Sequence, residues 1–196
     1  MKVGIIYLAA GNSRRFGTNK LLYELDKRPM YQHLLLRLAK LCRKYPRFEI
    51  TVVTQYEEIF SYVSGMERGG LMVNAVYSPD SRKGVSYSVK AGIRAVESWS
   101  DACAFFVADQ PYLTGKSAER FLLEMERRKA ALGSVCCKGT AGNPTWFAKE
   151  YYPKLLELSG DLGGRRILKK YPEDVCVFEI ENGKELADMD EPENYR

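Results

Sequence analysis

The segment from Leu8 to Lys20 holds the residues best suited to chemistry in this chain, and it follows an apolar run at 3–8. It reads Leu-Ala-Ala-Gly-Asn-Ser-Arg-Arg-Phe-Gly-Thr-Asn-Lys. Gly11 and Gly17 allow the backbone to adopt positive φ angles or to approach a ligand that a side chain would block. Backbone N–H groups, the two arginines and the lysine can bind phosphate oxygens through charge-assisted hydrogen bonds. The segment therefore predicts a site for a triphosphate.

Two common phosphate-loop patterns do not fit this segment. A Walker A loop ends in Gly-Lys-Ser/Thr, and the dinucleotide fingerprint needs three glycines at fixed spacing. Here the two glycines are six residues apart, and the lysine comes three residues after the second. An ordinary strand-to-helix turn with cations on its surface is the alternative interpretation.

Acidic residues at two other places could hold a metal ion beside such a triphosphate. Asp109 directly follows the apolar run 102–108, and Mg²⁺ takes one or two carboxylates together with phosphate oxygens and water. Asp188 and Asp190 are two residues apart, so their side chains would point the same way on an extended segment. The alternatives are that Asp109 caps a helix or a turn, and that the C-terminal acids begin a helix at Pro192.

Strand-like and helix-like segments alternate along the chain. Apolar runs typical of strands occur at 3–8, 50–54, 71–77, 102–108, 133–137 and 175–180. Helical spacing of apolar residues occurs at 30–45, 85–98 and 116–129. Helices between apolar strands imply crossover connections, and hence an α/β fold with a Rossmann-like, mostly parallel sheet and helices on both faces, in three layers. No linker or repeat divides the chain, so residues 1–196 are expected to form a single domain.

The predicted sheet explains how distant residues could share one site. Ligands of such sheets bind beyond the carboxyl ends of the strands. The run at 3–8 delivers the glycine loop to that edge, and the run at 102–108 delivers Asp109 to it. The cations and the carboxylate are therefore expected to converge on one polyphosphate.

Composition restricts the class of protein and the kind of partner. The 196 residues are 45% hydrophobic and 28% charged, with a net charge of +5 and a pI near 8.9. This balance suits a globular protein that binds a small polyanion, and the dispersed charge argues against nucleic acid. The five cysteines form no Cys-x-x-Cys pair and the single histidine is His33, which disfavours a zinc site or a Cys–His dyad. We expect a cytoplasmic protein, because the cysteines are expected to be free thiols and the N-terminus matches a signal peptide poorly. No apolar run approaches about 18 residues, so no membrane span is expected.

In sequence order, these motifs resemble those of the MobA-like NTP transferase superfamily. The glycine loop is similar to the signature Leu-Ala-Ala-Gly-x-Ser/Gly-x-Arg-hydrophobic-Gly-x-x-Lys. Ala-Asp-Gln-Pro at 108–111 is similar to the second motif, in which the aspartate holds the metal. The stretch 79–88 looks like the glycine–serine loop before the family's third helix, with a plain capped helix start as the alternative interpretation.

Three further segments resemble the molybdenum cofactor cytidylyltransferase (MocA-like) branch of this superfamily. They are Gly-Asn-Pro at 142–144, Gly-Asp-Leu-Gly-Gly-Arg-Arg at 160–166 and Asp-Met-Asp-Glu-Pro-Glu-Asn-Tyr at 188–195. A solvated cationic helix is the alternative interpretation of the second segment. Two residues depart from the branch pattern: Asn143 stands where histidine is usual, and Glu191 stands where threonine is common.

The resemblance implies roles for individual residues. The implied catalytic residues are Arg15, Lys20 and Asp109. The implied nucleotide-binding residues are Leu8, Ala9, Ala10, Gly11, Asn12, Ser13, Arg14, Lys20, Ser88 and Asp109. Mg²⁺ is the implied cofactor, held by Asp109 and Asp188, with Asp190 as the alternative to Asp188. The implied acceptor-binding residues are Gln110, Gly142, Asn143, Pro144 and Arg165.

The expected function is Mg²⁺-dependent transfer of CMP from CTP to molybdopterin, with release of pyrophosphate. The acceptor phosphate is already ionised at neutral pH, so the reaction needs no general base, which agrees with the single histidine. One alternative is a nucleotidyltransferase of the same superfamily that uses GTP or a sugar- or alcohol-phosphate acceptor. The other is a non-catalytic carrier that delivers molybdenum cofactor to a molybdenum hydroxylase, the implied protein partner. The presence of both Lys20 and Asp109 favours an enzyme.

Overall fold

The apolar run near the N-terminus forms strand β1 (Val3–Ala9), an inner strand of the main sheet. We describe residues 1–12, 19–68 and 73–189 of the computed structural model of the chain. β1 pairs in parallel with β4 (Phe48–Thr54) on one side and with β6 (Ala102–Val107) on the other. Strands that are flanked on both sides and covered on both faces need apolar residues at nearly every position, which is the pattern of this run.

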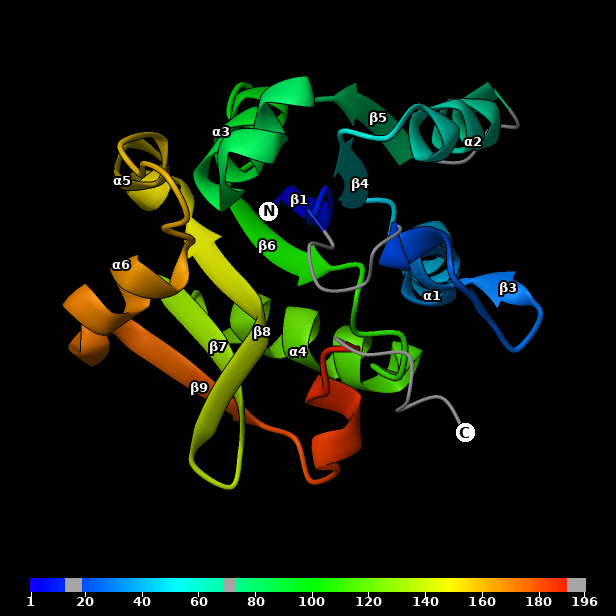
Figure 1. The fold of residues 1–196 in the computed structure, drawn as a ribbon. Coiled ribbons are helices and arrows are strands. Elements are labelled where there is room, and N and C mark those ends of the chain that lie inside the picture. The colour runs from blue at the N-terminus through cyan, green and yellow to red at the C-terminus, as the bar shows by residue number, and fades with distance from the viewer. Residues whose placement is uncertain (13–18, 69–72, 190–196) are drawn as a thin grey trace.

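The main sheet contains seven strands. The other four are β5 (Val73–Tyr77), β7 (Leu132–Cys137), β8 (Thr140–Ala148) and β9 (Val175–Glu179). Their order is β5-β4-β1-β6-β8-β7-β9 (Figure 1). β8 is antiparallel to both of its neighbours, and every other neighbouring pair is parallel. The expected mostly parallel α/β sheet is therefore confirmed. A separate small ribbon pairs β2 (Glu24–Leu25) with β3 (Arg28–Pro29).

Strand β8 is absent from the sequence prediction. It contains Gly142, Asn143 and Pro144, and glycine, asparagine and proline are typical of turns. Its register with β7 shifts between Ser134, which pairs with residue 145, and Val135, which pairs with residue 142. Residues 143 and 144 lie in this bulge, where a proline without an N–H costs no ladder hydrogen bond. Pairing with two neighbouring strands thus makes a strand of a sequence that resembles a loop.

Helices cover both faces of the sheet (Figure 1). They are α1 (Met30–Lys44), α2 (Glu57–Arg68), α3 (Val85–Val96), α4 (Gly115–Arg128), α5 (Tyr152–Leu156) and α6 (Arg165–Lys170). Residues of α1, α2 and α4 form one buried cluster with Ile5 and Tyr7, whereas residues of α3, α5 and α6 form a second with Ile6. Alternate residues of a strand face opposite sides, so the two clusters lie on the two faces of the sheet. The three predicted helices correspond to α1, α3 and α4, and the prediction lacks α2 and α5.

Helix α3 approaches β1 closely, and a glycine makes this approach possible. A Cβ atom at Gly92 would lie 2.4 Å from Cγ2 of Ile6, which is closer than side-chain carbons pack. Short 3-10 helices lie between the main elements. They are η1 (Lys20–Leu22), η2 (Pro79–Lys83), η3 (Lys149–Tyr151), η4 (Pro172–Asp174) and η5 (Gly183–Leu186).

The cysteines are free thiols. Burial raises the pKa of Cys42 to about 12 and also raises the pKa of Cys103, so both thiols stay protonated at neutral pH. Among the described residues, no helix has both the length and the apolar character that crossing a bilayer requires.

Candidate functional site

The carboxyl ends of β1 and β6 lie side by side and deliver two of the sequence motifs to one edge of the sheet. The N–H of Ala108 donates to the carbonyl of Leu8, 3.0 Å away, so the two chains remain in contact where the strands end. Residues 10–12 continue from β1, and Asp109 continues from β6. The guanidinium of Arg37 on α1 donates to the carbonyls of Pro111 and Leu113, which holds the loop after Asp109 against that helix.

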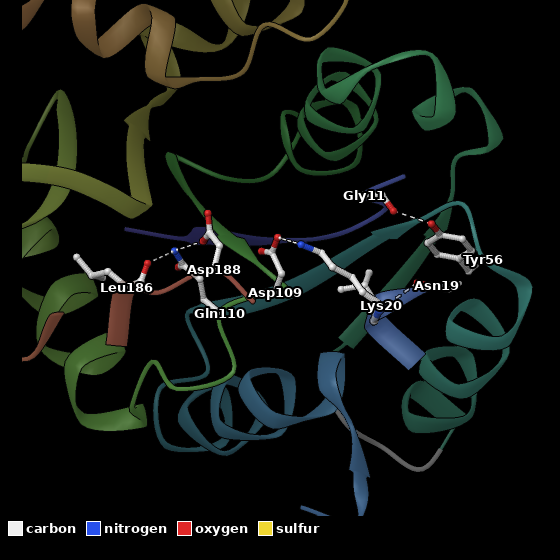
Figure 2. Close-up of polar contacts among 9 residues, drawn as sticks. Gly11, Asn19, Lys20, Tyr56, Asp109, Gln110, Leu186 and Asp188 are labelled. Atoms are coloured by element: carbon white, nitrogen blue, oxygen red, sulfur yellow. Dashed lines mark hydrogen bonds and ion pairs between the residues drawn. The ribbon is translucent and has the colours of Figure 1, made fainter. Parts of the chain in front are cut away.

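Lys20 and Asp109 are in direct contact at this edge (Figure 2). Nζ of Lys20 donates to Oδ2 of Asp109 over 2.8 Å, and the lysine residue is only 8% exposed. Asn19 begins η1, because its side-chain oxygen accepts the N–H of Leu21 and so fixes the start of the turn that carries the lysine. A cation and an anion held together here provide one group for phosphate and one group for a metal ion. The two residues thus lie together, as the sequence predicts, and their convergence on a polyphosphate remains a prediction.

Tyr7 lies beneath this pair in the core. Burial, followed by the negative charge of Asp109, raises its pKa well above the ordinary value. The hydroxyl therefore stays protonated and donates to the carbonyl of Tyr31 at 2.7 Å. The side chain is a structural support for the site rather than a proton-transfer group.

A cavity of about 380 Å³ opens beside the ion pair, within the size range of small-molecule sites. Seven of the predicted nucleotide or catalytic residues line it: Leu8, Ala10, Gly11, Asn12, Lys20, Ser88 and Asp109. The remaining lining residues were not individually predicted to bind nucleotide; they are Leu21, Ser81, Val85, Val107 and Asp161. Gly11 does not adopt the positive φ that its residue type allows; a Cβ atom there would extend into open space, with no atom within 4 Å.

Ser88 is held in a chain of buried hydroxyl groups. Its Oγ donates to Oγ of Ser81 at 2.8 Å, and that oxygen donates to Oγ of Ser78 at 3.0 Å. Because the hydroxyl proton of Ser88 is used within the protein, the oxygen presents lone pairs to the cavity. This serine can therefore accept a hydrogen bond from a ligand.

A second cavity of about 440 Å³ adjoins the first and shares with it a wall of four residues. The shared residues are Leu8, Val85, Val107 and Asp161. Three cations of α6 line the second cavity, namely Arg165, Arg166 and Lys169. None of these three forms an ion pair with another described residue. The second cavity is therefore suited to an anionic ligand beside the first.

The loop before α6 is fastened to the start of α3. The N–H of Ser86 donates to the carbonyl of Gly160 at 3.1 Å. Gly84 has a φ of 145°, and a Cβ atom there would lie 2.4 Å from the same carbonyl oxygen. Glycine is thus required at position 84 both for its φ and for this close contact. The contact places the 160–164 loop along both cavities.

The predicted acceptor residues separate into two groups. Asn143 and Arg165 line the second cavity. Gly142 packs against Leu186, Pro144 is buried in β8, and Gln110 is 1% exposed. None of these last three predicted residues lines either cavity.

Gln110 instead fastens the C-terminal segment to the end of β6 (Figure 2). Its Nε2 donates to Oδ1 of Asp188 at 2.8 Å and to the carbonyl of Leu186 at 3.1 Å. The N–H of Met189 donates to the carbonyl of Asp109 at 3.0 Å. Nearby, the carboxylate of Glu185 accepts the N–H of Thr114, so this segment is attached at several points. The attachment brings the predicted metal ligands from residues 109 and 188 together.

Replacing Gln110 with leucine is expected to loosen this segment. Two hydrogen bonds are lost, so the free energy of unfolding should fall by about 1–2 kcal/mol. Trypsin should cleave faster after Lys184, and saturation of activity should require more Mg²⁺. Chemical denaturation, limited proteolysis and a magnesium titration measure these effects. Unchanged proteolysis and an unchanged magnesium requirement would contradict the role given to Gln110.

The donor set at this edge fits Mg²⁺. Asp109 and Asp188 supply carboxylate oxygens, which hard cations prefer, and Mg²⁺ usually takes one or two carboxylates and completes its shell with phosphate and water. Among the described residues, no cluster of three or more histidine, cysteine or acidic side chains could enclose a metal.

Several predicted residues lie outside the described part of the chain: Ser13, Arg14, Arg15 and Asp190. Their roles remain predictions. Ala9, also predicted to bind nucleotide, is buried at the end of β1. Gln55 and Tyr56 are contacts of the glycine loop that sequence reasoning missed, although they directly follow β4 at the same sheet edge. Applying the edge rule to every strand would have found both residues.

Comparisons with known proteins agree with this geometry. The sequence pattern of the MobA-like NTP transferase domain matches residues 5–175. The Bacillus subtilis purine catabolism protein PucB is 30% identical over 198 residues, covering 97% of this chain and 92% of PucB. A probable molybdenum cofactor guanylyltransferase from Pyrococcus horikoshii is 39% identical over 59 residues, or 30% of each protein.

Solved structures share the fold. The crystal structure of Rv0371c from Mycobacterium tuberculosis has a TM-score of 0.78 at 18% identity, covering 100% of this chain and 96% of that chain. The complex of Rv0371c with manganese has a TM-score of 0.71 at 16% identity, covering 93% and 90%.

Proposed function

The chain belongs to the MobA-like NTP transferase family, and we propose that it transfers CMP from CTP to the phosphate of molybdopterin, with release of pyrophosphate. One observation carries the proposal. The contact of Lys20 with Asp109 lies in a cavity that adjoins a second cavity, lined by cations of α6 that form no ion pair with other described residues. The first cavity suits a nucleoside triphosphate with its metal ion, and the second suits a phosphorylated acceptor.

The chain's own residues would position and neutralise the two reactants. The amine of Lys20 exchanges the carboxylate of Asp109 for phosphate oxygens of the nucleotide, and cations of α6 hold the acceptor phosphate. An acceptor oxygen attacks the α-phosphorus, a new O–P bond forms, and the bond to the β-phosphate breaks to release pyrophosphate. Lys20 stabilises the charge that grows during this step. Asp109 and Asp188 would hold Mg²⁺, which supplies positive charge to the phosphates when it is bound.

The identity of the acceptor rests on resemblance to the molybdenum cofactor branch. The Pyrococcus relative, whose name contains molybdenum cofactor guanylyltransferase, supports an acceptor of this kind. The same name supports GTP as the second candidate donor. Asn143 lines the second cavity and stands where the branch usually has histidine, so it is the position at which the choice of acceptor would differ.

Pyrophosphate release tests the proposal. The protein is incubated with Mg²⁺, each of CTP, GTP, ATP and UTP, and molybdopterin, or with a sugar phosphate in its place. We expect release with CTP and molybdopterin. Release with GTP supports GTP as the donor. Release with the sugar phosphate but not with molybdopterin contradicts the proposed acceptor. Binding of molybdenum cofactor without turnover of any nucleotide would contradict an enzymatic function and favour that of a carrier.

A further inference from the structure

We propose that Gln55 and Tyr56 are positioning residues that turn the peptide groups of the glycine loop so that its N–H groups face the phosphates. This inference rests on the proposed function, because it concerns the nucleotide site. Both residues follow β4, whose last residue, Thr54, pairs with Ala9 of β1. They therefore lie directly beside residues 10–12.

Each of the two side chains binds a carbonyl oxygen of the loop. Nε2 of Gln55 donates to the carbonyl of Ala10 at 2.7 Å. The hydroxyl of Tyr56 donates to the carbonyl of Gly11 at 2.6 Å (Figure 2). Two consecutive peptide groups are thus held by their oxygens from the side of β4 and α2.

The geometry of a trans peptide converts this contact into an orientation of donors. The C=O and the N–H of one peptide group point in opposite directions. If Gln55 holds the carbonyl of Ala10, the N–H of Gly11 points away from Gln55. In the same way, Tyr56 directs the N–H of the following residue, Asn12. A peptide group turned over would instead present a carbonyl oxygen to a polyanion, which repels it.

The two sides of the loop are different places in the structure. Gln55 and Tyr56 line a shallow hollow together with residues of α2 and with Tyr77, and neither residue lines the nucleotide cavity. Ala10, Gly11 and Asn12 do line that cavity. The carbonyl oxygens of the first two are therefore held on the side away from the cavity.

The side chain of Asn12 extends the same network. Its Oδ1 accepts a second hydrogen bond from Nε2 of Gln55 at 3.0 Å, and its Nδ2 donates to the carbonyl of Arg82 at 3.0 Å. Through Asn12, Gln55 is thus linked to η2, whose Ser81 also lines the nucleotide cavity. The side-chain amide of Asn12 is engaged within the protein, which leaves its backbone N–H as the group for a ligand.

Binding of two probes by three variants tests the inference. Tyr56→Phe removes one hydroxyl, and Gln55→Met removes, at similar volume, the amide that donates to Ala10 and to Asn12. Gln55→Glu places an acceptor against two acceptors and should have the largest effect. The dissociation constants of CTP and of inorganic tripolyphosphate, each with Mg²⁺, are measured by calorimetry. We expect each neutral substitution to weaken both probes about fivefold, and the same factor for the two probes, because the loop contacts phosphate and not base.

Further measurements separate positioning from a general loss of structure. Tyr62→Phe, on an exposed tyrosine of the adjoining helix α2, is the control and should bind both probes as the wild type does. In turnover, the KM of the nucleotide should rise while the KM of the acceptor stays constant. Variants that bind tripolyphosphate like the wild type overturn the inference alone. A wild-type protein that binds neither CTP nor tripolyphosphate overturns the proposed function, and the inference with it.

Discussion

Lys20→Ala is expected to lower turnover by roughly 10²–10³-fold while weakening nucleotide binding by less than about tenfold. In the proposed reaction the amine meets charge that grows on the phosphates as pyrophosphate departs, so its contribution would be larger in the transition state than in the ground state. In the structure it is already directed to this position by its contact with Asp109 and by the cap at Asn19. Steady-state kinetics of pyrophosphate release and calorimetry with CTP and Mg²⁺ measure the two effects.

The chain offers a matched control for this variant. Lys44 also forms an ion pair, with Glu119 at 2.6 Å, but it lies at the end of α1 on the surface. Lys44→Ala should leave turnover unchanged, since an exposed ion pair contributes little. A Lys20→Ala protein with near-normal turnover, or one that loses binding and turnover in equal proportion, would be incompatible with the transition-state role.

The part of the site that could be predicted from sequence is the part that simple geometry controls. An apolar run followed by Gly11, and a second run followed by Asp109, are local patterns. The rule that parallel strands end at one edge then brings the two patterns together without further information. The contact of Lys20 with Asp109 required only one additional short turn, which Asn19 begins.

The parts that could not be predicted depend on contacts between distant segments. β8 becomes a strand because β6 and β7 pair with it on both sides, although Pro144 and its neighbours resemble a turn. Gln110 belongs to a motif that suggests a ligand contact, yet its amide binds Asp188 and Leu186. Single-sequence patterns do not report such pairings; the two partners of Gln110, for example, are more than seventy residues away from it.

Because sequence patterns do not report contacts between segments, residues inside the glycine loop could be predicted, whereas the residues that hold it could not. Gln55 and Tyr56 carry no motif of their own, and their importance follows only from the carbonyl groups that they bind. Ser81 and Asp161 belong to the predicted segments 79–88 and 160–166 but were not individually named as site residues, and they line the first cavity from η2 and from the loop before α6. A residue that faces a ligand can be recognised by its type, whereas a residue that orients a neighbour requires the coordinates.

Asp109→Asn is expected to have opposite effects on magnesium binding and on phosphate binding. The substitution keeps the shape of the side chain but removes its charge, so turnover with CTP and Mg²⁺ should fall by about 10³-fold and the magnesium needed for half-maximal activity should rise. In the absence of Mg²⁺ the same substitution should strengthen phosphate binding. Lys20 then has no carboxylate at residue 109 to neutralise it, so tripolyphosphate should bind more tightly to the variant than to the wild type.

Two further measurements complete the test: the free energy of unfolding of Asp109→Asn, and the same binding experiments on Asp188→Asn. Lys20 is nearly buried, so loss of the opposite charge should lower the free energy of unfolding by about 1–2 kcal/mol, a reduced value because the carboxylate is partly exposed. Asp188→Asn is the comparison: it should raise the magnesium requirement without tightening metal-free tripolyphosphate binding, because Asp188 is held by Gln110. If Asp109→Asn binds metal-free tripolyphosphate no more tightly than the wild type, the carboxylate of Asp109 does not compete with phosphate for the lysine. The exchange of partners at Lys20 would then be wrong, even if the metal role of Asp109 survived.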